Sequence, residues 1–247
     1  MGDILKIKRR NVSFLVYEHE SPNISDFWHN ENWENFTYEV LENFLDKEHS
    51  YIDVGVHLGE TILFGAQLSK TCYAVEPDPE CIRIASKNIE LNNINNIKLI
   101  PKALGNNCSK IMLGAPGSLS LGSSATTYFN AELSANSFET ESISIPKLVE
   151  QENINDLNFI KIDVEGMEDL IIENIGAIDL PLLVEVHTSL LFYKYKGLEI
   201  IVNHLGKFKN IVIFIAGRKF KIKANEILNL YEEENNPRGY FSVLAYN

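Results

Sequence analysis

The sequence is poor in cysteine and contains no long apolar run. Its 247 residues include three cysteines, Cys72, Cys81 and Cys108, and no C-x-x-C spacing. An odd count without that spacing predicts neither a disulfide framework nor a zinc knuckle. Nothing approaches the roughly 18 consecutive apolar residues of a membrane-spanning helix, and the longest runs, such as residues 211–216, have the length of a strand. We therefore expect a cytoplasmic protein with no membrane span.

Basic residues are scarce relative to acidic ones. Lys and Arg number 22 and Asp and Glu number 34, so the formal net charge is −12. Affinity for nucleic-acid phosphates requires clustered Lys and Arg, which argues against a nucleic-acid partner. Cationic or neutral small ligands remain compatible with this charge. The apolar fraction of 45% is that of a folded globular protein and argues against a largely disordered chain.

Short apolar runs alternate with helical patterns along the chain, which is typical of a parallel α/β sheet. Strands are expected at residues 51–54, 72–75, 97–100, 159–163, 182–186, 211–215 and 241–245, and helices at 33–46, 58–69, 78–91, 167–175 and 198–205. Alternation over residues 3–18 predicts a β-hairpin. Residues 105–144 are rich in Ser, Gly, Thr and Asn, so we expect hairpins and a loop there.

We expect one domain, because no repeat and no linker-like change of composition divides the chain. Residues 1–48, with a hairpin and a helix, are expected to form a lid or cap of that domain. Residues 49–247 are expected to form its ligand-binding part, with a hairpin insertion at about residues 106–145.

The ends of the first two predicted strands of the sheet carry a candidate ligand site. In an open parallel sheet, ligands bind at the carboxyl ends of the strands. Asp53 ends the first strand and is followed by Gly55 and Gly59, and Glu76 ends the second, 23 positions after Asp53. Glycine lets the backbone approach a ligand closely. An acid about 20 residues beyond such a turn can accept hydrogen bonds from ribose hydroxyls.

The same segment disfavours a dinucleotide. That fingerprint would place glycine at positions 55, 57 and 60, whereas the chain has His57 and Glu60. Asp53 also brings negative charge to the place where a pyrophosphate would lie. A cationic ligand with a ribose fits better, and S-adenosylmethionine carries a sulfonium and an ammonium group. The alternative is an α/β domain with an ordinary glycine turn.

Five short motifs give the chain its family resemblance. They are DVGVHLG at residues 53–59, VEP at 75–77, ALG at 103–105, KIDVEG at 161–166 and EVH at 185–187. Together they resemble the FkbM family of class I S-adenosylmethionine methyltransferases over about residues 30–245. The family usually has Ala-Asn where this chain has Val56 and His57. Histidine and asparagine both tolerate positive φ, so we expect the turn to be retained.

The resemblance implies a Rossmann-like fold with a seven-stranded, mostly parallel sheet and helices on both faces. It also implies S-adenosyl-L-methionine as methyl donor, with S-adenosyl-L-homocysteine as product. The implied cofactor contacts are Asp53, Gly55, His57, Gly59 and Thr61 around the methionine half, Glu76 at the ribose, Pro77 beneath the adenine, Lys102 and Ala103 at its edge, and Asp163 at the methionine amino group or the incoming nucleophile.

Four polar residues at two neighbouring strand ends are candidates for catalysis: Asp163, Glu165, Glu185 and His187. Methyl transfer needs the acceptor atom held against the methyl carbon, and a hydroxyl acceptor also needs a base. Alternation along the strand puts Glu185 and His187 on the same side, and histidine titrates in the useful range. Alternatively, Asp163 and Glu165 cap the following helix and His187 caps a loop.

Oxygen ligands and an imidazole can also hold a divalent metal. Carboxylates on two strands are not by themselves a metal signature, so we expect no metal. Three further sets of residues are candidates for binding the methyl acceptor. Residues 27–29 with Trp33 form either a lid over the pocket or a cover for the sheet edge. Residues 114–117 and 120–124 either bring hydroxyl groups to the pocket or form hairpin turns, and residues 193–196 are a third candidate set.

The function we favour is O-methylation of a hydroxyl on a saccharide or small natural product. An RNA or peptide N-methyltransferase is an alternative, although the proline-aromatic tetrad that holds a flipped base (N-P-P-Y) is absent and the net charge is wrong for RNA. A non-catalytic S-adenosylmethionine-binding module is a third reading. The partner we expect is a small-molecule or glycan acceptor.

Overall fold

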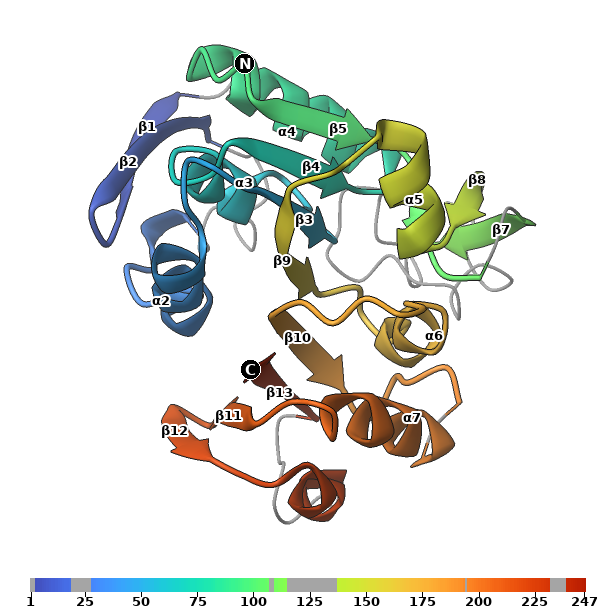
Figure 1. The fold of residues 1–247 in the computed structure, drawn as a ribbon. Coiled ribbons are helices and arrows are strands. Elements are labelled where there is room, and N and C mark those ends of the chain that lie inside the picture. The colour runs from blue at the N-terminus through green and yellow to red at the C-terminus, as the bar shows by residue number, and fades with distance from the viewer. Residues whose placement is uncertain (1–2, 19–27, 107–108, 115–136, 194, 232–238) are drawn as a thin grey trace.

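A computed structural model describes residues 3–18, 28–106, 109–114, 137–193, 195–231 and 239–247 (Figure 1). A central sheet has eight strands in the order β12-β11-β13-β10-β9-β3-β4-β5. Their bounds are β3 Ser50–Val54, β4 Thr71–Val75, β5 Ile97–Ile100, β9 Leu157–Ile162, β10 Leu182–His187, β11 Asn210–Ile215, β12 Arg218–Lys221 and β13 Tyr240–Tyr246.

The sheet is mostly parallel, as the sequence predicts. Strands β5, β4, β3, β9 and β10 pair in parallel, and β13 lies antiparallel between β10 and β11. All seven predicted strands of the sheet are present. Strand β12 is an eighth, which pairs antiparallel with β11 at the edge. Its four residues, R-K-F-K, are all exposed, so they lack the apolar alternation by which a strand is predicted.

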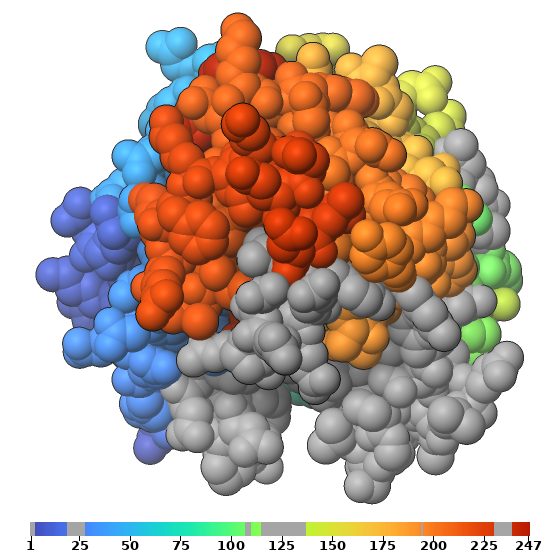
Figure 2. Space-filling model, turned by 90° about the horizontal axis from the view of Figure 1, so that it is seen from below, coloured from blue at the N-terminus to red at the C-terminus, as the bar shows by residue number. Residues whose placement is uncertain are grey.

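Helices cover both faces of the sheet. They are α2 Asn35–Phe44, α3 Glu60–Gly65, α4 Pro79–Leu91, α5 Ile145–Glu152, α6 Glu168–Glu173, α7 Tyr195–Leu205 and the 3₁₀ helix η2 Ala224–Tyr231. One core cluster joins the sheet to α5, α6, α7 and η2, and a second joins it to α2, α3 and α4. Seen from below, α7, β12 and η2 form much of the surface (Figure 2). Helices α5 and η2 were not predicted.

The start of α4 shows how the sequence fixes an element boundary. The Asp78 carboxylate accepts hydrogen bonds from the N–H groups of Glu80 and Cys81, and Pro79 occupies the first turn. Proline costs nothing there because its missing N–H would have no partner within the helix. Helix α5 begins in a similar way, with the Ser144 hydroxyl accepting from Lys147 N–H.

The N-terminal hairpin packs on the same face as α4. Strands β1 (Ile4–Arg9) and β2 (Val12–Tyr17) pair as predicted. Asn92 exchanges two hydrogen bonds of 2.7 Å with the backbone of Leu15, and Asn88 accepts one from Tyr17 N–H. The hairpin and α2 therefore belong to the second core cluster together with the sheet.

The predicted insertion contains a small three-stranded sheet in the order β6-β8-β7. Its strands are β6 Ala103–Leu104, β7 Ser109–Gly114 and β8 Ser137–Ile143. Within the described ranges, no helix combines the length and apolar character needed to cross a membrane.

Candidate functional site

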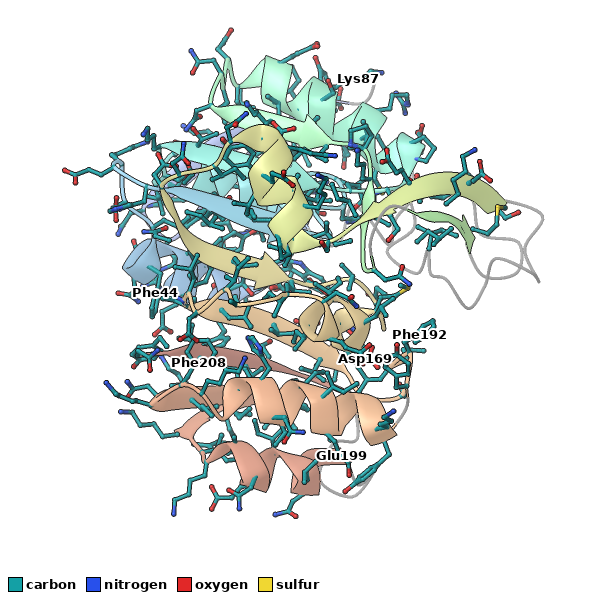
Figure 3. The ribbon with its side chains drawn as sticks, turned by 45° about the vertical axis from the view of Figure 1, so that its right-hand side comes forward. Phe44, Lys87, Asp169, Phe192, Glu199 and Phe208 are labelled. Carbon is teal, nitrogen blue, oxygen red and sulfur yellow. The ribbon has the colours of Figure 1, made fainter. Side chains whose placement is uncertain are left out.

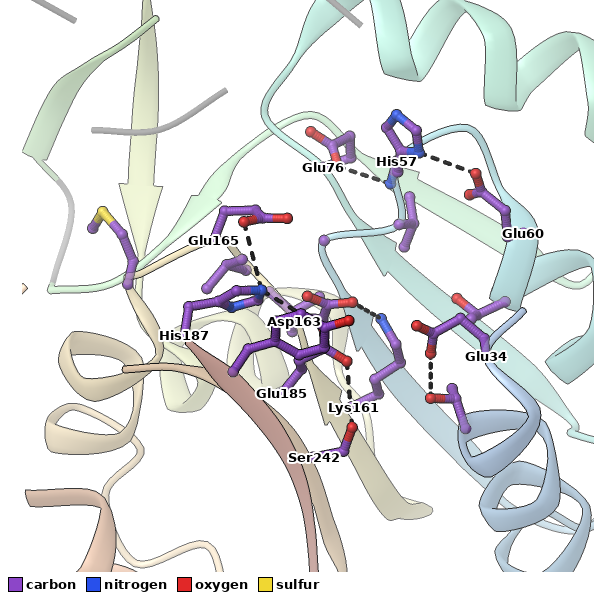
Figure 4. A pocket seen from close by; sticks show the side chains of 18 of the residues that line it. Glu34, His57, Glu60, Glu76, Lys161, Asp163, Glu165, Glu185, His187 and Ser242 are labelled. Carbon is purple, nitrogen blue, oxygen red and sulfur yellow. Dashed lines mark hydrogen bonds and ion pairs between the residues drawn. The ribbon is translucent and has the colours of Figure 1, made fainter. Parts of the chain in front are cut away.

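A pocket of about 760 Å³ lies at the carboxyl ends of β3, β4, β9 and β10. Most of the predicted site residues line it: Gly55, His57, Thr61, Glu76, Pro77, Lys102, Ala103, Asp163, Glu165, Glu185 and His187. Figure 4 shows Glu76 and His57 on one side of the pocket, and Glu165, Glu185 and His187 on the other. The sequence therefore brings two groups of polar residues to one cavity.

Asp53 and Gly59 do not line the pocket. Asp53 is completely buried, and its Oδ2 accepts a hydrogen bond of 2.7 Å from the Thr61 hydroxyl. Its Oδ1 lies 3.2 Å from Nζ of Lys161, which is also 3.5 Å from Oδ2 of Asp163. Burial raises the pKa of Asp53, and the Lys161 ammonium opposes that rise. Asp53 thus supports the pocket from beneath.

The turn after β3 has three residues with positive φ: Gly55 at 78°, His57 at 48° and Gly59 at 103°. A Cβ at position 55 would lie 1.7 Å from the carbonyl oxygen of Asp163, so only glycine fits where this turn passes the end of β9. His57 tolerates the left-handed conformation, as predicted. The departure from the family's Ala-Asn therefore leaves the turn intact.

Glu76 is held by the backbone of this turn. Its Oε2 accepts a hydrogen bond of 3.0 Å from His57 N–H, and its Oε1 accepts one of 2.9 Å from Asp78 N–H. Burial raises the pKa of Glu76 to about 7, against the lowering effect of these two bonds. Each carboxylate oxygen has a second lone pair, so Glu76 can still accept from hydroxyls in the pocket.

His187 is the centre of the opposite wall. Its Nδ1 lies 2.7 Å from Oε1 of Glu168, and its Nε2 lies 3.5 Å from Oε2 of Glu165 and 3.6 Å from Oε1 of Glu185. Burial alone would lower the pKa of His187, but the surrounding carboxylates, chiefly Glu168 and then Asp163 and Glu165, raise it to about 10. The imidazole is thus protonated when the pocket holds no other cation.

Two neighbouring carboxyl groups, those of Glu185 and Glu165, have pKa values above those of ordinary surface acids. Burial and the charge of Asp163 raise the pKa of Glu185 well above its usual range. Burial also raises the pKa of Glu165 to about 7, although His187 partly offsets it. The Ser242 hydroxyl donates to Glu185 Oε2 over 3.3 Å. Both carboxyl groups therefore hold a proton at a higher pH than surface carboxyl groups do.

Glu34 and Glu168 are among the residues of the site that were not predicted. Glu34 precedes α2 with φ of 55°, lines the pocket and accepts a short hydrogen bond from the Thr37 hydroxyl. Burial, and then Asp163, raises the pKa of Glu34. No pattern around Glu34 distinguishes it from a surface acid. Glu168 lies two residues beyond the KIDVEG motif, and this short distance was the only indication in the sequence that it belongs to the site.

Of the residues predicted to bind the methyl acceptor, some line the pocket and others pack in the core or on the surface. Trp33 lines the pocket, whereas Trp28 is buried in the second core cluster and accepts from Arg9 through its carbonyl. Tyr193 donates its hydroxyl to Glu173 and is not part of the pocket lining. Phe27, residues 115–117 and 120–124, and Lys194 lie outside the described residues.

The same wall offers donors for a metal ion. Asp163, Glu185 and His187 each present one ligand atom, and these atoms lie within 4.8 Å of one another. Oxygen and imidazole ligands suit several divalent cations. The Lys161 ammonium beside Asp163 occupies part of this space with positive charge.

The geometry supports two kinds of chemistry in one cavity. The Glu76 side offers a buried carboxylate to hydroxyl groups, as nucleoside-binding sheets do at this position. The His187 side offers an imidazole held by a carboxylate, which is the arrangement of a general base and the group that orients it.

Comparisons with known proteins agree with the motifs. Residues 53–218 match the family described as the methyltransferase FkbM domain. No curated protein sequence matches the chain.

Solved structures similar to this fold have low sequence identity. A methyltransferase FkbM from Methylobacillus flagellatus KT is 12% identical, with 91% of this chain and 54% of that chain covered and a TM-score of 0.41. An rRNA methylase from Streptococcus thermophilus is 12% identical, with 86% and 95% covered and a TM-score of 0.48. A precorrin-6y C5,15-methyltransferase from Geobacter metallireducens GS-15 is 11% identical, with 87% and 89% covered and a TM-score of 0.46.

Proposed function

Because the chain belongs to the FkbM family and is therefore an S-adenosylmethionine-dependent methyltransferase, we propose that it methylates a hydroxyl group of a saccharide or small natural product. The observation that carries this proposal is the buried His187 imidazole, whose Nδ1 contacts Glu168 while its Nε2 lies among pocket carboxylates. A neutral hydroxyl must lose a proton as it is methylated, so the site needs a group that accepts one.

The Glu76 side of the pocket fits the nucleoside part of the cofactor. Glu76 accepts hydrogen bonds from the ribose hydroxyls, while Pro77, Lys102 and Ala103 line the adenine end. The turn from Gly55 to Thr61 surrounds the methionine part, and Asp53 with Lys161 supports it from below. When bound, the cofactor supplies an electrophilic methyl group on a sulfonium.

The opposite wall holds the acceptor. Asp163, Glu165 and Glu185 accept hydrogen bonds from its hydroxyl groups and orient one oxygen toward the methyl carbon. The hydroxyl proton passes to Nε2 of His187, and the oxygen that loses it would receive the methyl group that the bound cofactor supplies. Methyl transfer to a hydroxyl group thus requires two things from the protein: it orients the acceptor oxygen, and it accepts the hydroxyl proton.

His187 must be neutral to accept that proton. Its pKa of about 10 in the pocket without ligand reflects nearby carboxylates that outnumber the cations. A positively charged methyl donor among these carboxylates adds repulsion against the imidazolium, which lowers the pKa of His187. Cofactor binding and activation of the base are therefore coupled electrostatically.

Two measurements test the proposal. We expect S-adenosylhomocysteine to bind with micromolar affinity, about −8 kcal/mol, by isothermal titration, and Glu76→Ala to weaken it at least about tenfold. A screen with methyl-labelled cofactor against saccharides and hydroxylated natural products should then find transfer that His187→Ala reduces by about 100-fold or more.

The matched control is His49→Ala, which removes an exposed imidazole that pairs with Asp46 outside the pocket. It should bind S-adenosylhomocysteine and transfer methyl groups as the unmodified protein does. Transfer to amines or RNA but not to hydroxyls would overturn the O-methylation proposal.

A further inference from the structure

Glu168 is a completely buried carboxylate that contacts His187 and does not line the pocket. Resting on the proposed hydroxyl methylation, we propose that Glu168 is the positioning residue of the reaction. It keeps a proton on Nδ1 of His187 and so leaves the Nε2 lone pair directed at the acceptor when the imidazole is neutral. Nothing in the motifs assigns this role.

Glu168 Oε1 contacts two groups, the His187 imidazole and the Gly166 N–H. This oxygen lies 2.7 Å from His187 Nδ1 and accepts a hydrogen bond of 3.1 Å from Gly166 N–H. The second bond ties the carboxylate to the backbone of its own loop, so it cannot follow a rotation of the imidazole. A carboxylate accepts hydrogen bonds and donates none, so Nδ1 must carry the hydrogen.

The elements that carry the two residues are joined at two further points. Gly166 has φ of 107°, and a Cβ there would lie 2.5 Å from the carbonyl oxygen of Leu190, so the loop before α6 packs directly on the segment after β10. Asp169, next to Glu168, accepts hydrogen bonds of 3.1 and 2.7 Å from the N–H groups of Phe192 and Tyr193. Figure 3 shows Asp169 on α6 near Phe192. Helix α6 therefore holds the strand and loop that carry His187.

The other side of the imidazole faces the pocket. Nε2 has carboxylate oxygens of Glu165 and Glu185 at 3.5 and 3.6 Å, both longer than a charge-assisted hydrogen bond. The Tyr240 ring lies beside the imidazole, with 5.8 Å between ring centroids. Nε2 is thus the nitrogen that can exchange a proton with a methyl acceptor. Glu168 fixes this assignment because it keeps the hydrogen on Nδ1.

Glu168 also starts a short helix, so a purely structural role has to be separated from a positioning role. Glutamine at position 168 would not move the hydrogen, because its amide oxygen can replace Oε1 and accept from both Gly166 N–H and Nδ1. Leucine has a similar size but offers Nδ1 no acceptor, so the carboxylates of Glu165 and Glu185 near Nε2 become the remaining acceptors for the imidazole hydrogen. The neutral imidazole would then present a hydrogen instead of a lone pair to the methyl acceptor.

The decisive experiment is ¹⁵N NMR of the histidine ring nitrogens, recorded against pH with S-adenosylhomocysteine bound, for the unmodified protein, Glu168→Leu and the control Glu173→Gln. Glu173 lies at the other end of α6 and accepts a hydrogen bond from the Tyr193 hydroxyl. In the unmodified protein and the control, neutral His187 should carry its hydrogen on Nδ1. In Glu168→Leu it should carry the hydrogen on Nε2, and the pKa of His187 should fall because its nearest carboxylate is gone.

The groups that face His187 are Glu168, Glu165, Glu185, Asp163 and Tyr240, and four of these five remain in the Glu168→Leu variant. A neutral His187 with its hydrogen on Nε2 in the unmodified protein would overturn the proposal. This measurement on the unmodified protein keeps the proposal testable even where Glu168→Leu does not fold.

Turnover gives a second readout once an acceptor is found. Glu168→Leu should reduce kcat about 100-fold or more while affinity for S-adenosylhomocysteine stays within about twofold. The double variant Glu168→Leu/His187→Ala should be no slower than His187→Ala, because Glu168 acts through His187. Additive losses would contradict the proposal. Failure of the hydroxyl-methylation proposal would appear separately, as absent cofactor binding or transfer to another acceptor class.

Discussion

The ammonium group of Lys161 lies 3.2 Å from Oδ1 of Asp53, and both side chains are almost completely buried. The two residues are direct neighbours on the parallel strands β3 and β9. Burial would lower the pKa of Lys161, but Asp53 and Asp163 raise it above its ordinary value, so the pair stays charged. Lys161 also lines the pocket, together with Glu76 on one side and His187 on the other.

Lys161→Met should therefore destabilise the protein by about 3–5 kcal/mol, because it leaves the Asp53 carboxylate buried without its cation. Urea unfolding measures this loss. The double variant Asp53→Asn/Lys161→Met should recover much of it, since neither charge remains. The control is Lys98→Met, which breaks an exposed pair with Glu152 and should cost about 1 kcal/mol or less. Equal losses in the two single variants would contradict a buried charged pair.

Gly55→Ala should abolish binding of S-adenosylhomocysteine, because its Cβ would overlap the carbonyl oxygen of Asp163 and push the turn away from β9. Gly176→Ala is the control, because Gly176 has a similar positive φ, 71° against 78°, and does not line the pocket. Its Cβ would meet only a side-chain atom, Cγ of Pro146 at 3.1 Å. The control should lose about 1–2 kcal/mol of stability, chiefly through backbone strain, and keep its affinity.

Calorimetric titration of both glycine variants separates strain from steric overlap. If Gly176→Ala lost affinity to the same extent as Gly55→Ala, backbone strain rather than the contact with Asp163 would explain the effect.

Local sequence signals predicted much of this fold. Asp78 and Pro79 marked the start of α4 because capping depends on neighbours within three residues. The strand ends placed Glu76 and His187 at one cavity because parallel strands finish at one edge. Strand β12 escaped prediction because its exposed residues, such as Phe220, show no burial pattern.

The site partners that were missed depend on tertiary contacts. Glu168 and His187 are 19 positions apart and belong to different elements, so no periodicity connects them. Glu34 reaches the pocket only because its backbone adopts φ of 55° at the start of α2. Glutamate gives no sign of that conformation in a sequence, whereas glycine would have done so.

The affinity for S-adenosylhomocysteine should rise between pH 6 and pH 8. Burial raises the pKa of Glu76 to about 7, so below pH 7 the group is mostly protonated and accepts hydrogen bonds from ribose less well. Calorimetric titration at pH 6, 7 and 8 should show the rise in the unmodified protein and a flatter profile in Glu76→Gln. An identical profile in the variant would assign the pH dependence to another group.

The same ionisation affects stability with a definite sign. In the unfolded chain Glu76 ionises near its ordinary pKa, so between about pH 4.5 and 7 the folded protein holds more protons than the unfolded one. Its contribution to the free energy of unfolding therefore decreases as the pH rises through this range. Glu76→Gln removes that decrease, which urea unfolding at pH 5 and pH 8 would measure against the unmodified protein.

Methyl transfer should survive removal of divalent metal ions. Asp163, Glu185 and His187 have ligand atoms within 4.8 Å of one another, but two cations already neutralise part of this group. Lys161 Nζ lies 3.5 Å from Asp163, and the raised pKa of about 10 keeps His187 charged without ligand. A divalent ion would have to displace the His187 proton and approach the ammonium at close range, where repulsion is strong.

We therefore expect turnover to stay within about twofold after treatment with EDTA and after addition of Mg²⁺, since the base and its orienting carboxylate are side chains. Lys161→Met tests whether the ammonium group keeps metal ions away. Without it, Mn²⁺ should bind more tightly in calorimetric titrations than it does to the unmodified protein. Loss of turnover with EDTA that Mg²⁺ restores would show that a metal ion, rather than His187 and Lys161, balances the carboxylates during transfer.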